Sequence, residues 1–151
     1  MEQNAEFAIQ LLTEIKTVPV YRLYNPYTGE HLLSNNETEK NTLIKGGWKL
    51  YGVAWNSVTE GTTVYRLYNP YDQSHLYSMN QQEIQNCLKL GWKMDGPVSH
   101  SAAKENGVPI YRLFNPYVTS HYHLFSTSQA EINMLTRAGW KMEGIAWYAA
   151  K

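Results

Sequence analysis

The sequence predicts an α+β fold of three pseudo-symmetric β-β-α-β repeats around an approximate threefold axis, preceded by an N-terminal helix. The main observation is a phrase that recurs about every 45 residues. It occupies Val20–Tyr27, Val64–Tyr71 and Ile110–Tyr117. A second observation is a step from His to Ser after each phrase, and a third is a Gly-Trp-Lys triplet further on. Short repeats must share a core, which favours several equivalent sites over one asymmetric catalytic centre.

The first two elements of each repeat are predicted to form a β-hairpin. Tyr21 and Leu23 alternate with Arg22 and Tyr24, and the following Asn-Pro ends the strand in a turn. A second strand is expected at His31–Ser34 and at the matching positions of the other copies.

A helix and a third strand are predicted to complete each repeat. Asn or Ser followed three positions later by Glu is a capping box, in which the Glu side chain bonds back to the N-cap. These pairs are Asn36 with Glu39, Asn80 with Glu83, and Ser128 with Glu131. The third strands are expected at Trp48–Trp55, Trp92–Val98 and Trp140–Trp147. Glycine at positions 52, 96 and 144 predicts a bulge or a close approach of another backbone in each.

The chain divides into a leading segment and one binding domain. Residues 18–151 form the domain, with repeats at about 18–60, 61–106 and 107–151. Residues 1–17 are predicted to be a helix or linker with an apolar stripe that includes Leu11 and Ile15. This segment is expected to cap the array, to join it to an attached catalytic domain, or to mediate self-association.

Composition excludes several classes of partner. The 13 basic and 13 acidic residues balance, so nothing attracts nucleic acid or anionic membrane in general. No apolar run approaches the length of a membrane span. The single cysteine, Cys87, cannot form an internal disulfide and is interpreted as a small core residue.

Known catalytic and cofactor-binding patterns are absent from the sequence. It has no His-Glu-x-x-His, no Gly-x-Ser-x-Gly and no phosphate-binding glycine loop. We therefore predict no catalytic residues, no cofactor and no enzyme activity of its own.

The recurring histidines and arginines each allow two interpretations. His31, His75 and His123 would converge on zinc under threefold symmetry, but a hydrogen bond to a neighbouring carboxylate or backbone group is favoured, so no metal site is predicted. The recurring arginines are Arg22, Arg66 and Arg112. Each guanidinium is expected either to hold loop carbonyls or the helix glutamate in place, or to donate two parallel hydrogen bonds to a ligand.

The aromatic residues are the main candidates for sugar stacking. Trp55 and Trp147 end the last strand beside polar loops, and the hairpin tips carry a tyrosine each, so all are expected to be partly exposed. The tip tyrosines are Tyr27, Tyr71 and Tyr117. By contrast, the tryptophans at the corner between helix and strand are expected in the core. These are Trp48, Trp92 and Trp140.

The repeat phrase, the His-x-Tyr/Phe-Ser step, the capped helix and Gly-Trp-x-x-x-Gly-x-Ala-Trp together resemble a tandem repeat family of secreted and cell-wall-associated bacterial proteins. Its members often follow the peptidoglycan-cleaving domains of lysins. The resemblance spans Val18 to Tyr148. It implies a non-catalytic module that binds peptidoglycan or a surface polysaccharide and targets a bacteriophage or bacterial lysin to the wall. Such a module acts outside the cell or after release from the cytoplasm of an infected host.

Two alternatives from other classes remain open: a protein-interaction module of a secreted or surface protein, and a small wall hydrolase. In the glycan-binding interpretation, a tip tyrosine, the neighbouring histidine and arginine, and the terminal tryptophan converge between adjacent repeats. The second copy carries Ser99 in place of that tryptophan, so its site is expected to be the weakest. Trp55→Ala and Trp147→Ala are expected to weaken binding without unfolding the domain, and Trp48→Ala is expected mainly to destabilise it.

Overall fold

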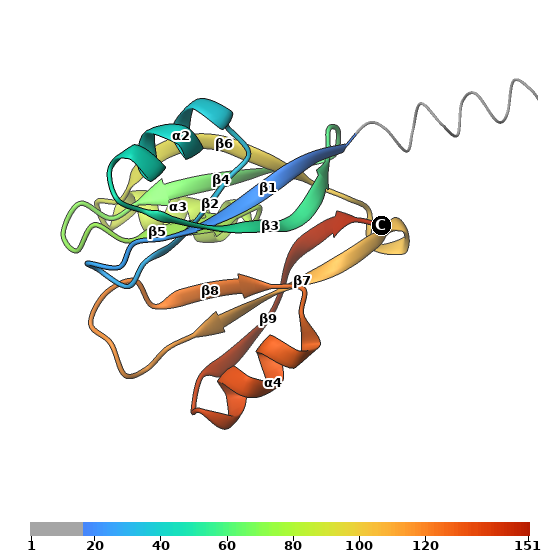
Figure 1. Ribbon diagram of the computed structural model, residues 1–151. Coiled ribbons are helices and arrows are strands. Elements are labelled where there is room, and N and C mark those ends of the chain that lie inside the picture. Colours follow the sequence, from blue (N-terminus) through green and yellow to red (C-terminus); the bar gives the residue numbers. More distant parts are fainter. Residues whose placement is uncertain (1–16) are drawn as a thin grey trace, which may run out of the picture.

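The computed structural model describes residues 17–151 and has an α+β fold, as predicted, in which the order β-β-α-β occurs three times in succession (Figure 1). Unit 1 consists of β1 (Thr17–Tyr24), β2 (His31–Ser34), α2 (Glu37–Lys45) and β3 (Lys49–Val58). Unit 2 consists of β4 (Thr62–Tyr68), β5 (His75–Ser78), α3 (Gln81–Lys89) and β6 (Lys93–Ser101). Unit 3 follows the short η1 (Lys104–Asn106) and consists of β7 (Gly107–Phe114), β8 (His123–Ser126), α4 (Gln129–Arg137) and β9 (Lys141–Ala150).

The helix expected over residues 1–17 lies outside the described residues, apart from Thr17, which begins β1. No helix within the described range is long and apolar enough to cross a membrane.

The three units share one strand register. In each, the first strand lies between the other two and pairs with both in the antiparallel direction. The pairing of β1 with β3 shifts at Val20/Tyr21 and at Arg22/Leu23, and the same shifts recur in units 2 and 3. Between the shifts Arg22 faces Gly52, whose φ of 105° favours glycine. The predicted bulges are therefore confirmed.

Each helix begins with half of the predicted capping box. The Asn36 side chain accepts from the Glu39 N–H, and Asn80 and Ser128 cap their helices in the same way. The Asn36 N–H, however, donates to Ser34 Oγ rather than to the glutamate. The reciprocal half of the predicted box is therefore wrong. A serine from the preceding strand replaces it and leaves the glutamate carboxylate available for another partner.

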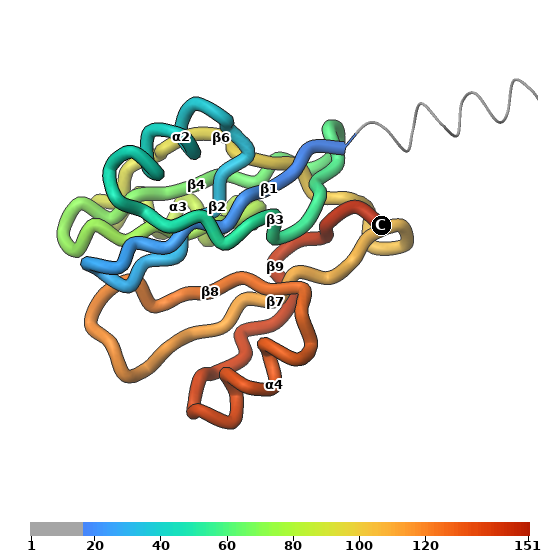
Figure 2. Tube along the Cα trace, in the orientation of Figure 1, coloured from blue at the N-terminus to red at the C-terminus, as the bar shows by residue number. Residues whose placement is uncertain are grey.

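The units are joined unequally. Units 1 and 2 form one six-stranded sheet, in the order β2-β1-β3-β6-β4-β5, through the single pair Val58 and His100. Unit 3 forms its own three-stranded sheet, β8-β7-β9. It contacts unit 2 through a backbone hydrogen bond of 2.9 Å from the Ala102 N–H to the Tyr148 carbonyl. The tube view shows unit 3, in orange and red, as a separate layer beneath the larger sheet (Figure 2).

The core is shared by all three units and corrects two predictions. The third strands β3, β6 and β9 contact one another, which brings Trp55 and Trp147 inside, at 7% and 2% exposure. Their rings meet edge to face with centroids 6.0 Å apart. The expectation that these two tryptophans are partly exposed is therefore wrong. The three corner tryptophans, expected in the core, are only half-buried: Trp48, Trp92 and Trp140.

Candidate functional site

The three units are linked by a cycle of ion pairs between the recurring arginines and helix glutamates. Each arginine makes a two-pronged bond to the glutamate of the preceding unit, and the first reaches round to the last. Arg66 donates to Glu39 at 2.9 and 2.6 Å. Arg112 donates to Glu83 at 2.9 and 3.0 Å, and Arg22 to Glu131 at 3.1 and 2.8 Å. Of the two interpretations of the arginines, the geometry supports the clamp on the helix glutamate.

The arginines differ in how strongly they are held. Arg66 Nε also donates to Asp95 at 2.5 Å, and its side chain is 9% exposed. Arg112 Nε donates to Glu143 at 2.9 Å, with 20% exposure. Unit 1 has Tyr51 at the corresponding position, so Arg22 has one carboxylate partner within the described residues. The clamp is therefore tightest between units 1 and 2.

The glutamates of this cycle are held ionised. Burial alone would raise the pKa of Glu83, but hydrogen bonds from Arg112 and Ser78 outweigh it, so the pKa is lowered. The pKa values of Glu39 and Glu131 are lowered in the same way by their own arginine and serine partners. At neutral pH each glutamate accepts hydrogen bonds and has no proton to donate.

Two crevices lie beside ion pairs, each between the helix start of one unit and the bulged third strand of the next. A third, smaller one lies between β2 of unit 1 and β6 of unit 2, and its lining does not include the ion pair. The 2–3 crevice, between units 2 and 3, has a volume of about 490 Å³. The 3–1 crevice has about 150 Å³ and the 1–2 crevice about 10 Å³. Small-molecule sites occupy roughly 300–1,000 Å³, and a single water needs roughly 10–15 Å³. By size, the 2–3 crevice is the candidate binding site.

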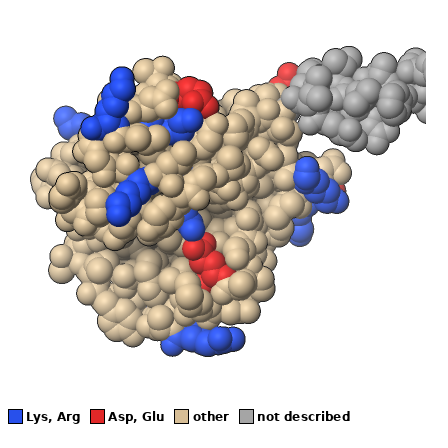
Figure 3. All heavy atoms as spheres, viewed as in Figure 1, with Lys and Arg blue, Asp and Glu red and all other residues tan. Residues whose placement is uncertain are grey.

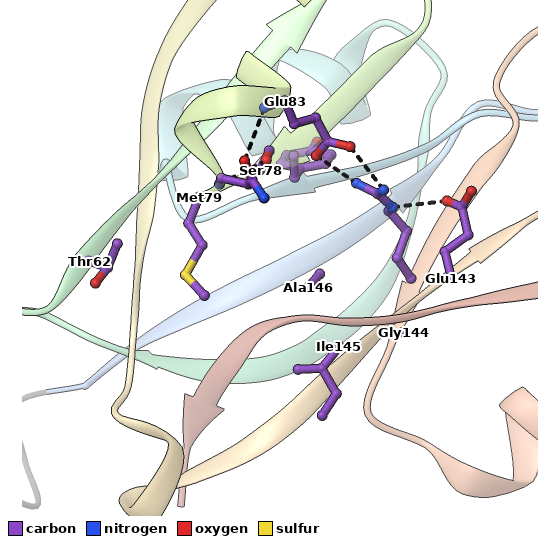
Figure 4. A pocket seen from close by; sticks show the side chains of 11 residues that line it. Thr62, Ser78, Met79, Glu83, Glu143, Gly144, Ile145 and Ala146 are labelled. Atoms are coloured by element: carbon purple, nitrogen blue, oxygen red, sulfur yellow. Dashed lines mark hydrogen bonds and ion pairs between the residues drawn. The ribbon is translucent and has the colours of Figure 1, made fainter. Parts of the chain in front are cut away.

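Both units contribute polar and apolar groups to the 2–3 crevice. Figure 4 shows Glu83 and Glu143 at the same end of the crevice. Both accept hydrogen bonds from the Arg112 guanidinium. Met79 from unit 2 and Ile145 from unit 3 extend the lining away from the charges. Charged hydrogen-bonding groups next to apolar surface are typical of sites for small polar ligands.

A tyrosine fills the 1–2 crevice from within. The Leu33 N–H donates to Tyr77 Oη at 2.8 Å, and Tyr77 Oη donates to the Leu33 carbonyl at 3.1 Å. Burial raises the pKa of this hydroxyl, which keeps it protonated. The corresponding residues in units 1 and 3 are Leu33 and Phe125, so neither other crevice receives such a hydroxyl.

The histidines do not converge on one point. His123 lies 3.0 Å from Glu143, and His75 lies 3.1 Å from the buried Glu30, which also contacts His121 at 2.9 Å. His31 Nδ1 is buried without a partner in the described part of the chain. Across residues 17–151 no three His, Cys, Asp or Glu residues are grouped to hold a metal ion. Two of the three histidines thus contact a carboxylate, as the favoured interpretation expected.

The hairpin-tip tyrosines form a separate surface. Tyr27, Tyr71 and Tyr117 are 86%, 81% and 72% exposed. Each lies against the glycine that ends the helix of its own unit: a Cβ on Gly91 would come within 3.0 Å of the Tyr71 hydroxyl. No tip tyrosine lines any of the three crevices.

The predicted convergence of tyrosine, histidine, arginine and tryptophan is therefore wrong. Only the arginines and the core tryptophans reach the crevices: Arg22 and Trp55 line the 3–1 crevice, and Arg112 lines the 2–3 crevice. Sequence reasoning missed Glu143, Asp95 and the sealing role of Tyr77. The available signal was that Tyr51, Asp95 and Glu143 vary at one repeat position, as do Leu33, Tyr77 and Phe125.

Charge on the surface is dispersed. On the face seen in Figure 3, lysine, arginine and acidic side chains stand in small groups between wide uncharged areas. This distribution agrees with the zero formal charge of the chain. It offers no extended basic surface on that face for a polyanion.

A family model described as a domain of unknown function (DUF5648) matches residues 19–150, which span all three units, and the chain belongs to that family. No curated protein and no solved structure is significantly similar to the chain.

Proposed function

We propose that this DUF5648 domain is a non-catalytic module that binds a glycan of the bacterial cell wall, either peptidoglycan or a surface polysaccharide, and delivers a lysin to it. The observation that carries the proposal is repetition around a closed ring. Three units of one register are joined head to tail by the arginine–glutamate cycle. We infer an approximate threefold axis from this cycle, because each unit meets the next through the same pair.

Repetition suits a polymer with a repeating surface. A domain that displays an exposed tyrosine on each of three units meets a glycan array at several points. Joined weak sites raise the overall affinity far above that of any one of them. In this proposal, ligand contact falls mainly to the crevices, which Arg22 and Arg112 help to line, and to the hairpin tips.

The state of the helix glutamates supports a binding role over hydrolysis. Glycoside cleavage by paired carboxylates needs one of them protonated at the working pH, with a raised pKa. Glu83, the helix carboxylate in the 2–3 crevice, has a lowered pKa and binds Arg112 through both oxygens. It is suited to accept hydrogen bonds from ligand hydroxyls.

The test is a fluorescent fusion of the chain incubated with purified Gram-positive cell walls from a broad panel of species. Labelling that survives protease treatment of the walls supports a glycan receptor. Failure to label any wall of the panel contradicts the proposal. Loss of turbidity of the walls under this chain alone would instead identify a hydrolase.

A protein-interaction module is the second candidate, favoured by exposed apolar side chains along β3. Tyr51 and Val53 are more than half exposed, and Leu50 beside them is 43% exposed. Exposed apolar clusters mark protein-binding surfaces. Labelling of walls that disappears after protease treatment would select this function.

A further inference from the structure

The backbone of one edge strand in each unit points into the neighbouring crevice. Strands β2, β5 and β8 each lie at an edge of a sheet. Leu33 of β2 faces Arg22 of β1, and its N–H and C=O bind Tyr77 Oη rather than β1. The C=O also accepts a hydrogen bond of 3.3 Å from Arg66 Nη1. In antiparallel pairs, alternate residues direct both backbone groups outward.

The same groups are open in the other two crevices. Tyr77 faces Arg66, and Phe125 faces Arg112, in the register that Leu33 has with Arg22. Their N–H and C=O therefore also point away from the hairpin, into the 2–3 and 3–1 crevices. No side chain within residues 17–151 binds them there, whereas a buried polar backbone group requires a partner.

We propose that the 2–3 crevice binds a sugar hydroxyl in the place that the Tyr77 hydroxyl takes in the 1–2 crevice. The ligand hydroxyl accepts from the Tyr77 N–H and donates to the Tyr77 carbonyl. This inference deepens the proposed function and rests on it, since it assigns the glycan to one crevice and to one pair of backbone groups.

The pair of backbone groups selects the chemistry of the ligand. A hydroxyl donates and accepts at the same atom, whereas a carboxylate only accepts and an ammonium only donates. A glycan carries such hydroxyls on every ring. The volume of about 490 Å³ admits a ligand of this class.

The rest of the crevice offers matching contacts. Arg112 uses three of its five N–H donors on Glu83 and Glu143, which leaves two for a ligand. The carboxylates retain acceptor capacity, and Ile145 and Met79 present apolar surface for the faces of sugar rings. The 3–1 crevice, at about 150 Å³, falls below the range of small-molecule sites and is expected to bind more weakly.

The decisive variant is Phe125→Tyr. The Phe125 ring packs edge to face on Tyr77 with centroids 5.5 Å apart, as part of the unit that follows Tyr77. The Tyr77 hydroxyl is hydrogen-bonded to the Leu33 N–H and C=O. By analogy, a hydroxyl added at residue 125 is expected to bind the Tyr77 N–H and C=O and so to exclude the ligand. The matched control is Phe114→Tyr, which adds the same atom where units 1 and 2 already carry Tyr24 and Tyr68.

Binding is measured by calorimetry with saccharides released from Gram-positive walls by muramidase, and by amide NMR of the wild-type chain with the same fragments. We expect Phe125→Tyr to weaken binding at least about tenfold, with an unchanged or raised melting temperature. Phe114→Tyr is expected to bind like the wild type. The Tyr77 and Arg112 Nε signals of the wild type are expected to shift on titration.

Each other outcome counts against the inference. If the fragments bind but Phe125→Tyr binds equally and the Tyr77 amide does not shift, the crevice is not the site, while the proposed function stands. If neither walls nor fragments bind the wild type, both fall. Should Phe125→Tyr fold poorly, the Tyr77 shift in the wild-type chain decides alone.

Discussion

The linings of the 1–2 and 2–3 crevices share several repeat positions, but the two crevices differ greatly in volume. Between units 1 and 2, the Tyr77 hydroxyl is hydrogen-bonded to the backbone of Leu33, and the crevice has a volume of about 10 Å³. Between units 2 and 3, the corresponding ring is Phe125, and about 490 Å³ is open. The Tyr77 hydroxyl thus binds backbone groups at one joint, and no side chain of the described residues binds the corresponding groups at the other.

A second substitution reinforces the difference. Ser99 stands where the other units have tryptophan, and its hydroxyl lies 2.7 Å from that of Ser57. The small side chain lets β3 and β6 approach and pair at Val58 and His100. Unit 3 keeps Trp147 and forms a separate sheet. Repeats of similar sequence can therefore form one interface that is closed by strand pairing, between units 1 and 2, and one that leaves a crevice, between units 2 and 3.

The largest expected effect is on the core that both joints share. Trp147 is 2% exposed and packs on Phe125 and Tyr77, so Trp147→Ala is expected to cost about 3–5 kcal/mol of unfolding free energy. Trp48→Ala, at a half-buried site, is expected to cost less than half as much. Urea denaturation of the two variants measures both values. An equal loss of unfolding free energy in the two variants would contradict the assignment of Trp147, rather than Trp48, to the core.

The next effect concerns the clamps beside the two crevices. Arg66→Met removes the most buried arginine and leaves Glu39 and Asp95 facing each other, at a cost of about 3 kcal/mol. Arg22→Met removes a more exposed arginine with one carboxylate partner and is expected to cost about 1 kcal/mol. The difference in chemical denaturation midpoint between the two variants tests whether Arg66 stabilises the protein more than Arg22 does. A larger loss of stability in Arg22→Met would contradict this order.

Opening the sealed joint is expected to have a smaller cost. Tyr77→Phe leaves the Leu33 N–H without a partner, while the Leu33 C=O keeps the hydrogen bond from Arg66 Nη1; stability should fall by about 1–3 kcal/mol. Hydrogen exchange of the Leu33 amide should accelerate in this variant. An unchanged melting temperature together with unchanged exchange would show that the hydroxyl does not seal the joint.

A pH-dependent effect on stability is expected at His31. Burial and then Arg22 lower the pKa of His31 to about 4, against the smaller opposite influence of Glu131 and Glu30. As pH falls from about 6.5 to 4, His31 binds a proton in the unfolded chain but stays neutral in the folded chain. Stability should then fall by at most about 1.4 kcal/mol per pH unit.

His31→Phe keeps a ring beside Tyr24 and Tyr51 and removes this titration. Its stability should decline less steeply over the same pH range in urea denaturation. The matched control is His75→Phe, which removes a histidine that contacts Glu30. Identical slopes for wild type and His31→Phe would contradict the assignment.

The smallest effect on stability is expected at the hairpin tips, which are alike in all three units. Tyr27→Ala removes a side chain that is 86% exposed and should change stability by no more than about 0.5 kcal/mol. Wall binding by the fluorescent fusion should weaken further with each tyrosine removed. Full binding by the triple variant at Tyr27, Tyr71 and Tyr117 would confine recognition to the crevices.

Local structure was determined by the sequence alone. The strand alternation around Arg22, the capping residues and the bulge glycines specify each β-β-α-β unit through neighbours close in the chain. Exposure of the tip tyrosines followed from the Asn-Pro turn, because a hairpin tip has few elements to pack against. The triple recurrence of arginine and glutamate also suggested that they pair.

Only the tertiary structure decided which unit supplies the partners of each recurring residue. Glu39 pairs with Arg66 rather than with the arginine of its own unit, and Trp55 is buried because three last strands meet at the centre. Both facts depend on how units are placed relative to one another, which a repeated local pattern leaves free. The sealed and open crevices likewise arise from contacts between residues such as Leu33 and Tyr77, which lie far apart in sequence and adjacent only in the folded ring.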